Sequence, residues 1–199
     1  MRWEPGTKDR LRAAALDLFA THGYEQTTAA EIAQSVGLTE RTFFRHFGDK
    51  RDVLFDGQAD YLQAYTEGVE AAPQDASAFE MISSALAAVA GRFGEDRRPY
   101  SRIRKQIIDA NPALAERELH KRSEAAATLA AALHARGVAE PTATLAAESG
   151  ATAFGIAFTQ WVRADETRTM AEIIDDVLAQ LRSFAVPRRA DHPARKLKV

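Results

Sequence analysis

Apolar residues recur along the chain at the three- and four-residue spacing that places them on one face of a helix. The first stripe predicts a helix over about residues 7–22, which Gly23 ends because glycine adopts the left-handed conformation at little cost. We find no convincing run of alternating β-branched residues, so the pattern indicates an all-α chain. The stripes and their Gly, Pro and polar separators predict about nine helices, over roughly 7–22, 28–36, 40–47, 50–70, 75–93, 99–109, 111–136, 141–163 and 167–184.

Two short predicted helices near the N-terminus are joined by a turn that contains glycine. The first begins with Thr28 and Glu31 at the spacing of a capping box, and Gly37 ends it. Thr39 is placed to cap the second. Such a helix-turn-helix can present the start of its second helix to base edges in the major groove. We expect Ile32, Val36, Leu38, Phe43 and Phe47 to hold the pair together, and Glu40, Arg41, Thr42, Arg45 and His46 to face outward.

The wider sequence from Thr27 to Lys50 strongly resembles the DNA-binding signature of TetR-family transcriptional regulators. The preceding residues 15–24 resemble it too, and the likeness covers about residues 7–55. It implies a helix-turn-helix DNA-binding domain over residues 1–52 and a larger helical ligand-binding and dimerisation domain over 53–185. Residues 186–199 would form a basic, flexible tail.

The resemblance also implies contacts to the DNA backbone. Thr28 stands where the family lets a helix N-terminus meet a phosphate, a contact that unpaired amides and the helix dipole favour. Lys50 matches the family's phosphate-anchoring position, and His46 matches a position that contacts the backbone. Phe44 stands where the family commonly has tyrosine, so it keeps the packing and loses a hydroxyl that reaches a phosphate.

Candidates for base recognition lie at the start of the second helix of the motif. Arg41 and Arg45 can make bidentate contacts to guanine, worth about 1–3 kcal/mol of discrimination, and Thr42 can touch a thymine methyl. Glu40 can accept a hydrogen bond from cytosine or simply cap the helix. The full set of candidate DNA-binding residues is Thr28, Thr39, Glu40, Arg41, Thr42, Phe44, Arg45, His46 and Lys50.

The longer helices that follow are rich in bulky apolar residues, most of which we expect in the core. A subset is expected to line a cavity for a small hydrophobic or amphipathic effector. The basic segment 97–105 is either a solvated helix start or an anion-binding group at the mouth of that cavity. The domain also looks weakly similar to a mycofactocin-associated, acyl-CoA-responsive branch of the family. Candidate ligand-binding residues are Leu86, Phe93, Arg102, Ile103, Ile107, Leu129, Phe154, Phe158 and Trp161.

The resemblance further implies a homodimer in which the last two helices pair with those of a second copy. Small residues over 146–153 would allow helices to approach closely, and an apolar stripe on the last helix would complete the interface. The candidate dimerisation residues are Gly150, Phe154, Ile174, Val177, Leu178 and Leu181.

Composition changes this picture only slightly. The net charge of −2 argues against a nucleic-acid binder, but it is an average: residues 1–55 hold eight basic and eight acidic residues, and residues 186–199 hold five and one. The chain contains no cysteine, which excludes disulfides and thiol-based redox sensing. We expect no cofactor, no metal and no membrane association, and a cytoplasmic protein.

Two other functions compete with DNA binding. The helix-turn-helix could mediate only protein contacts. A helical-bundle enzyme would need metal-binding Glu-x-x-His pairs, but none of the five histidines has Glu three residues before it. The preferred hypothesis is a ligand-responsive repressor, not an enzyme. It would bind a pseudo-palindromic double-stranded DNA operator as a dimer and be released by an effector.

Overall fold

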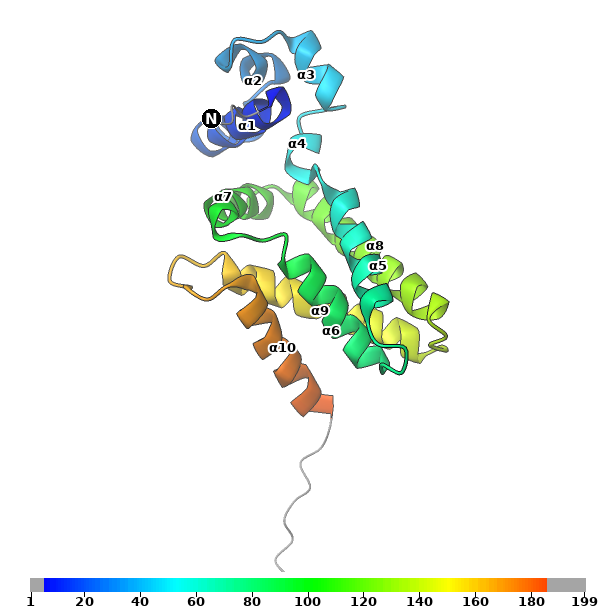
Figure 1. The fold of residues 1–199 in the computed structure, drawn as a ribbon. Coiled ribbons are helices and arrows are strands. Elements are labelled where there is room, and N and C mark those ends of the chain that lie inside the picture. Colours follow the sequence, from blue (N-terminus) through cyan, green and yellow to red (C-terminus); the bar gives the residue numbers. More distant parts are fainter. Residues whose placement is uncertain (1–5, 186–199) are drawn as a thin grey trace, which may run out of the picture.

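The structure is a computed structural model that describes residues 6–185, and every regular element in this range is helical (Figure 1). This confirms the predicted all-α fold. The predicted basic tail, residues 186–199, lies outside the described residues. The elements are α1 (Thr7–His22), α2 (Ala29–Ser35), α3 (Glu40–His46), α4 (Asp52–Phe55), α5 (Gln58–Ala71), α6 (Ala78–Ala90), the 3-10 turn η1 (Glu95–Arg97), α7 (Arg98–Asp109), α8 (Pro112–Ala135), α9 (Thr142–Trp161) and α10 (Met170–Ala185).

One predicted helix is broken in two. The sequence pattern predicted a continuous helix over 50–70, but α4 ends at Phe55 and α5 begins at Gln58. Asp56 adopts an extended conformation and Gly57 a left-handed one with φ 83°. The carboxylate of Asp56 accepts hydrogen bonds from Lys8, at 2.7 Å, and from Arg12. Long-range contacts with α1 therefore accompany a break that local periodicity does not reveal.

The described residues form two hydrophobic cores, which Figure 1 shows as an upper group of helices and a larger lower group. The upper core contains residues of α1, α2, α3 and α4, together with Ile107 and Ile108 of α7 and Leu114 of α8. The lower core joins α5, α6, α8, α9 and α10. Because Val53, Leu54 and Phe55 belong to the upper core, the change from one core to the other falls at residues 56–57.

A glycine permits the close approach of two helices in the lower core. A Cβ atom at Gly68 of α5 would lie 2.5 Å from the Cα of Ala85 and 2.8 Å from the carbonyl oxygen of Ser84. Real Cβ atoms do not approach backbone so closely, so α5 and α6 can pack at this spacing only without a side chain at position 68.

The helices of residues 6–185 are all too short or too polar to cross a membrane.

Candidate nucleic-acid interface and ligand cavity

The start of α2 has the predicted capping box. The hydroxyl of Thr28 accepts from the amide of Glu31 at 3.2 Å, and the Glu31 carboxylate accepts from the amide and the hydroxyl of Thr28 at 2.8 and 2.9 Å. Hydrogen bonds from the backbone and then the hydroxyl of Thr28 lower the pKa of Glu31. Thr28 is exposed, but both of its donors already serve Glu31. A phosphate at this helix start would therefore have to use the amides that follow Thr28.

The start of α3 is also capped as expected, and the helix presents two distinct faces. The hydroxyl of Thr39 accepts from the amide of Thr42 at 3.3 Å. Phe43 is fully buried, whereas Phe44 is 50% exposed. The candidates Glu40, Arg41 and Arg45 are exposed and Thr42 is partly exposed. Within residues 6–185, neither Arg41 nor Arg45 forms a side-chain hydrogen bond or ion pair.

His46 lies differently from the outward-facing position expected for it. Its side chain is partly buried, and its Nε2 atom is enclosed without a hydrogen-bond partner in the described part of the chain. The ring lines a small recess of about 280 Å³ with Phe47, Asp52 and Arg117. The recess is also bordered by Phe55, so the His46 side chain lies toward α4 and α8 rather than away from them.

Lys50 also has a different environment from the one that its match to the family implied. Its ammonium donates to the carbonyl oxygens of Tyr24, Glu25 and Thr27 at 2.7, 3.3 and 3.1 Å. It also lies 4.3 Å from the centroid of the Tyr24 ring. An ammonium has three donors, and all three are occupied by the loop between α1 and α2. In this structure, Lys50 therefore stabilises that loop, and its ammonium has no donor left for a phosphate.

A cavity of about 1150 Å³ lies where α1, α5, α7, α8 and α9 meet. Three of the nine candidate ligand-binding residues line it: Phe93, Phe154 and Phe158. The Phe93 ring centroid lies 5.6 Å from that of Phe154 and 5.8 Å from that of Phe158. Tyr61 also stacks on Phe93, at 5.3 Å. These rings form an aromatic wall.

The six other candidate ligand-binding residues do not line the cavity. Leu86, Leu129 and Trp161 are fully buried among the residues of the lower core. Ile103 is 37% exposed, and Ile107 packs in the upper core. Arg102 donates to the carbonyl oxygens of Val162 and Arg163 at 2.8 and 2.9 Å, which ties α7 to the end of α9.

The candidate dimerisation residues are mostly enclosed within the chain itself. Ile174, Val177 and Leu178 are buried against the lower core, and Leu181 packs partly buried beside them. A Cβ at Gly150 would lie 2.8 Å from Ile82, and Phe154 lines the cavity. The apolar stripe of α10 is thus covered by α6 and α9 rather than presented outward. On α9, by contrast, Leu145 and Ile156 are 65% and 53% exposed.

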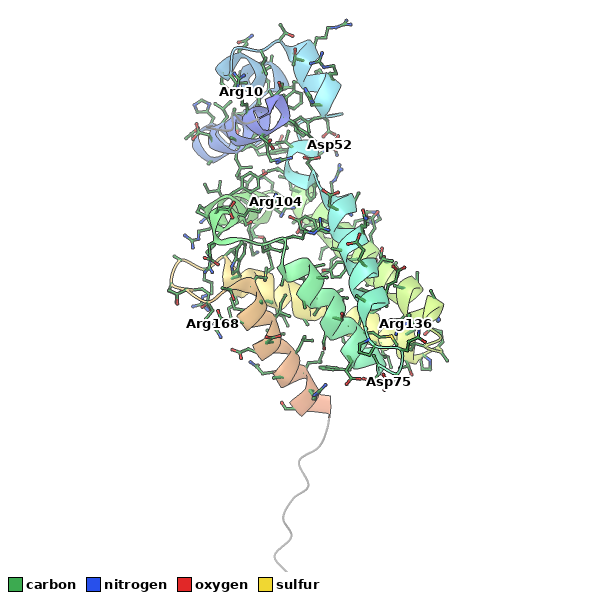
Figure 2. The ribbon with its side chains drawn as sticks, viewed as in Figure 1. Arg10, Asp52, Asp75, Arg104, Arg136 and Arg168 are labelled. Carbon is green, nitrogen blue, oxygen red and sulfur yellow. The ribbon has the colours of Figure 1, made fainter. Side chains whose placement is uncertain are left out.

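Arginines connect the two cores beside the cavity, a role that the sequence pattern did not indicate. Arg104 of α7 donates to the carbonyl oxygen of Leu54 and to the Glu118 carboxylate, the latter at 2.7 Å. Arg117 of α8 donates to Asp52 at 3.0 Å. Figure 2 places Arg104 and Asp52 where the upper helices meet the lower ones. The only sequence signal for Arg104 was its membership of the basic segment 97–105.

The acidic residue in the α4–α5 break is held ionised. Burial raises the pKa of Asp56, but hydrogen bonds from Lys8 and Arg12 outweigh that effect and lower it overall. Asp56, Lys8 and Arg12 all line the cavity. The lining of the cavity therefore includes the charged contact that joins α1 to the break between α4 and α5.

Known proteins resemble this chain in sequence and in fold. A family profile described as "Bacterial regulatory proteins, tetR family" matches residues 11–56. The HTH-type transcriptional regulator TcmR of Streptomyces glaucescens is 32% identical over 136 residues, which cover 65% of this chain and 60% of TcmR. The chain thus matches less than two thirds of that relative's length.

Solved structures show the same fold over most of the chain. The Thermus thermophilus FadR repressor in complex with lauroyl-CoA has a TM-score of 0.53 and 23% identity, covering 94% of this chain and 98% of that one. The regulator PfmR, also from Thermus thermophilus, has a TM-score of 0.51 and 25% identity, covering 87% and 97%. A TetR-family regulator from Syntrophomonas wolfei has a TM-score of 0.65 and 17% identity, covering 92% and 97%.

Proposed function

We propose that this chain, a transcriptional regulator of the TetR family, represses transcription by binding an operator as a homodimer. A small-molecule effector that enters the cavity would release the DNA. We propose a DNA-binding unit that extends to about Phe55 and a ligand-binding and dimerisation unit from Gln58 onward. The division is supported by the two hydrophobic cores.

The observation that carries the proposal is the outward face of α3. Arg41 and Arg45 are four residues apart, so they lie on one side of the helix about one turn from each other. Both are exposed, and their guanidinium groups are unengaged within residues 6–185. Phe43 anchors the helix in the upper core. A rigidly held helix with available guanidinium groups suits direct reading of base edges.

We propose that the second copy docks against the exposed face of α9 rather than against the buried stripe of α10. Leu145 and Ile156 are eleven residues apart, which places them about 16 Å apart along the helix at 1.5 Å per residue. Both are large, apolar and mostly exposed. A symmetric pair would use the same patch on both copies. Its recognition helices would have to lie about 34–36 Å apart to enter successive major grooves.

The ligand response is supported by what the cavity touches. Its lining includes Lys8 and Arg12 of α1 together with Asp56 and Gly57 at the α4–α5 break. An effector in this space would contact both cores and could favour one arrangement of them over another. It changes DNA affinity only if it binds the two arrangements with different affinity.

The test is DNA binding by the purified full chain. We expect a dimer to shift a pseudo-palindromic duplex from its own promoter region, with affinity that falls steeply as salt rises. A scrambled duplex of the same length and composition is the control. Absence of any shift with promoter DNA would contradict the proposal and favour a helix-turn-helix protein that mediates only protein contacts.

A further inference from the structure

Both aromatic rings and basic side chains line the cavity. We propose that it takes an amphipathic anion whose apolar body lies against Phe93, Phe154 and Phe158 and whose acidic group binds the ammonium of Lys121. This inference rests on the proposed function, because it treats the cavity as the effector site. It adds the charge of the effector and the residue that recognises it.

Lys121 of α8 lines the cavity with its ammonium near the ring of Tyr61. Its side chain is partly buried, and its Nζ atom lies 5.5 Å from the centroid of the Tyr61 ring. Within residues 6–185, its ammonium forms neither a hydrogen bond nor an ion pair. The nearby Glu118 carboxylate is already bound to Arg104 at 2.7 Å. A partly enclosed ammonium with its donors unused is a binding group for an anion.

Electrostatics supports this assignment. Burial, followed by repulsion from Arg104, lowers the pKa of Lys121 to about 8, and attraction by Glu118 offsets only part of this. A depressed pKa means that the surroundings disfavour the charged ammonium. An anion placed beside Nζ would relieve that cost and raise the pKa again.

The cavity lining contains more basic side chains than acidic ones. Six acidic residues line the cavity: Asp9, Asp56, Asp109 and Glu118 form ion pairs with Arg12, Lys8, Lys105 and Arg104, whereas Asp60 and Asp96 form none within residues 6–185. Arg122 follows Lys121 on the same helix, and its Nη1 atom lies 3.6 Å from the position that a Cβ of Gly155 would occupy. Arg122 lines the cavity too and forms no ion pair within the described range. Because eight basic side chains line the cavity against six acidic ones, its lining carries a net positive charge beside the aromatic wall.

The size of the cavity suits an organic anion better than an inorganic one. About 1150 Å³ exceeds the needs of a phosphate or an acetate and lies just above the range of about 300–1,000 Å³ typical of small-molecule sites. The rings of Phe93, Phe154 and Phe158 offer no hydrogen bond, so the part of the ligand that meets them must be apolar.

Two probes that share the same rings test the role of charge. 8-Anilinonaphthalene-1-sulfonate carries a sulfonate, and N-phenyl-1-naphthylamine lacks it; the fluorescence of both rises in apolar surroundings. We expect Lys121→Met to weaken binding of the sulfonate by about tenfold or more, the size of one charge-assisted hydrogen bond, and to leave the uncharged probe within about twofold. Lys105→Met is the matched control, because Lys105 lines the same cavity but pairs with Asp109 at 2.7 Å.

A pH titration of the same binding separates the charge of Lys121 from its shape. In the unsubstituted protein, sulfonate affinity should fall as the pH rises above about 8, because the free ammonium loses its proton there. Lys121→Arg keeps its charge at that pH, so it should bind the sulfonate with affinity that stays flat to about pH 9.5. A thermal melt of each variant verifies folding.

The outcomes are distinct. Unchanged sulfonate binding in Lys121→Met, or an equal loss for both probes, would overturn the assignment of Lys121. A sulfonate that binds through Lys121 without altering operator affinity would instead contradict the proposed ligand response and leave the charge preference of the cavity standing.

Discussion

Arg41 and Arg45 make the sharpest residue-level case, because their exposed guanidinium groups have no competing partner within residues 6–185. We expect Arg41→Ala and Arg45→Ala each to weaken operator binding by about 1–3 kcal/mol, the size of a lost bidentate base contact. Binding to a scrambled duplex should weaken less. Fluorescence anisotropy with both duplexes measures the difference.

The control for these variants is an arginine far from α3. Arg163, which follows α9 and pairs with Asp165, is exposed, so Arg163→Ala removes the same charge without touching the helix-turn-helix. It should bind both duplexes as the unsubstituted chain does. Normal operator binding by both Arg41→Ala and Arg45→Ala would show that base recognition has been assigned to the wrong residues.

Lys50 leads to a prediction about stability rather than DNA affinity. Its ammonium holds three carbonyl oxygens of the loop that precedes α2. Lys50→Met should lower the free energy of unfolding by about 1–3 kcal/mol, because hydrogen bonds to charged groups are worth about 1.5–3 kcal/mol and part of the loss is recovered by water. Urea denaturation measures the change. Arg51→Met removes a neighbouring exposed cation and should change stability by less than about 0.5 kcal/mol. If Lys50→Met lost DNA affinity with full stability, the phosphate-anchor hypothesis would be restored.

At the scale of elements, the capped starts of α2 and α3 were predictable and the break in the fourth predicted helix was not. Thr28 and Glu31 lie within one turn of each other, so their sequence spacing alone specifies the cap. The break at Asp56 involves Lys8 and Arg12, which are more than forty residues away. Hydrophobic periodicity describes one helix at a time, so it cannot register such contacts.

The same limit explains why the lining of the cavity and the packing partners of the last helix could not be predicted from periodicity. Phe93 and Leu86 are equally plausible lining residues by type, but Phe93 borders the cavity and Leu86 is enclosed by the core. Periodicity identified the apolar face of α10 through Ile174 and Val177. It did not tell whether α6 and α9 of the same chain or a second copy would cover that face.

The packing of α5 on α6 supplies an element-level prediction. We expect Gly68→Ala to destabilise the protein by about 1–3 kcal/mol, because the added methyl group meets the backbone at Ala85, which cannot rotate away. Thermal or urea unfolding measures this loss. Gly91→Ala, where the nearest atom would be 3.5 Å away and the backbone is right-handed helical, is the control. It should be neutral or slightly stabilising. Equal stability of both variants would contradict the tight approach of the two helices.

At the scale of the whole molecule, the two cores are joined by more than the chain connection at residues 56–57. The α7 helix contributes Ile107 and Ile108 to the upper core while Arg102 holds the end of α9. Arg104, which lines the cavity, donates a hydrogen bond to the carbonyl oxygen of Leu54 on α4. A ligand among these groups therefore contacts the residues that hold the two cores together. A change in the relative position of the cores is what would alter the spacing of the recognition helices in a dimer.

The proposed dimer makes the last prediction. Replacing both Leu145 and Ile156 by aspartate should convert a dimer to a monomer, since buried charges in a symmetric patch would face their own copies. Sedimentation velocity measures the mass. Operator affinity should then fall by about a hundredfold or more, because the second half-site no longer binds at high effective concentration. Leu119 of α8 lines the cavity but is 57% exposed and lies outside α9, so Leu119→Asp controls for adding charge to an exposed apolar residue and should remain dimeric. Dimers that survive the double substitution would move the interface away from this face of α9, while loss of the dimer in Leu119→Asp would implicate α8.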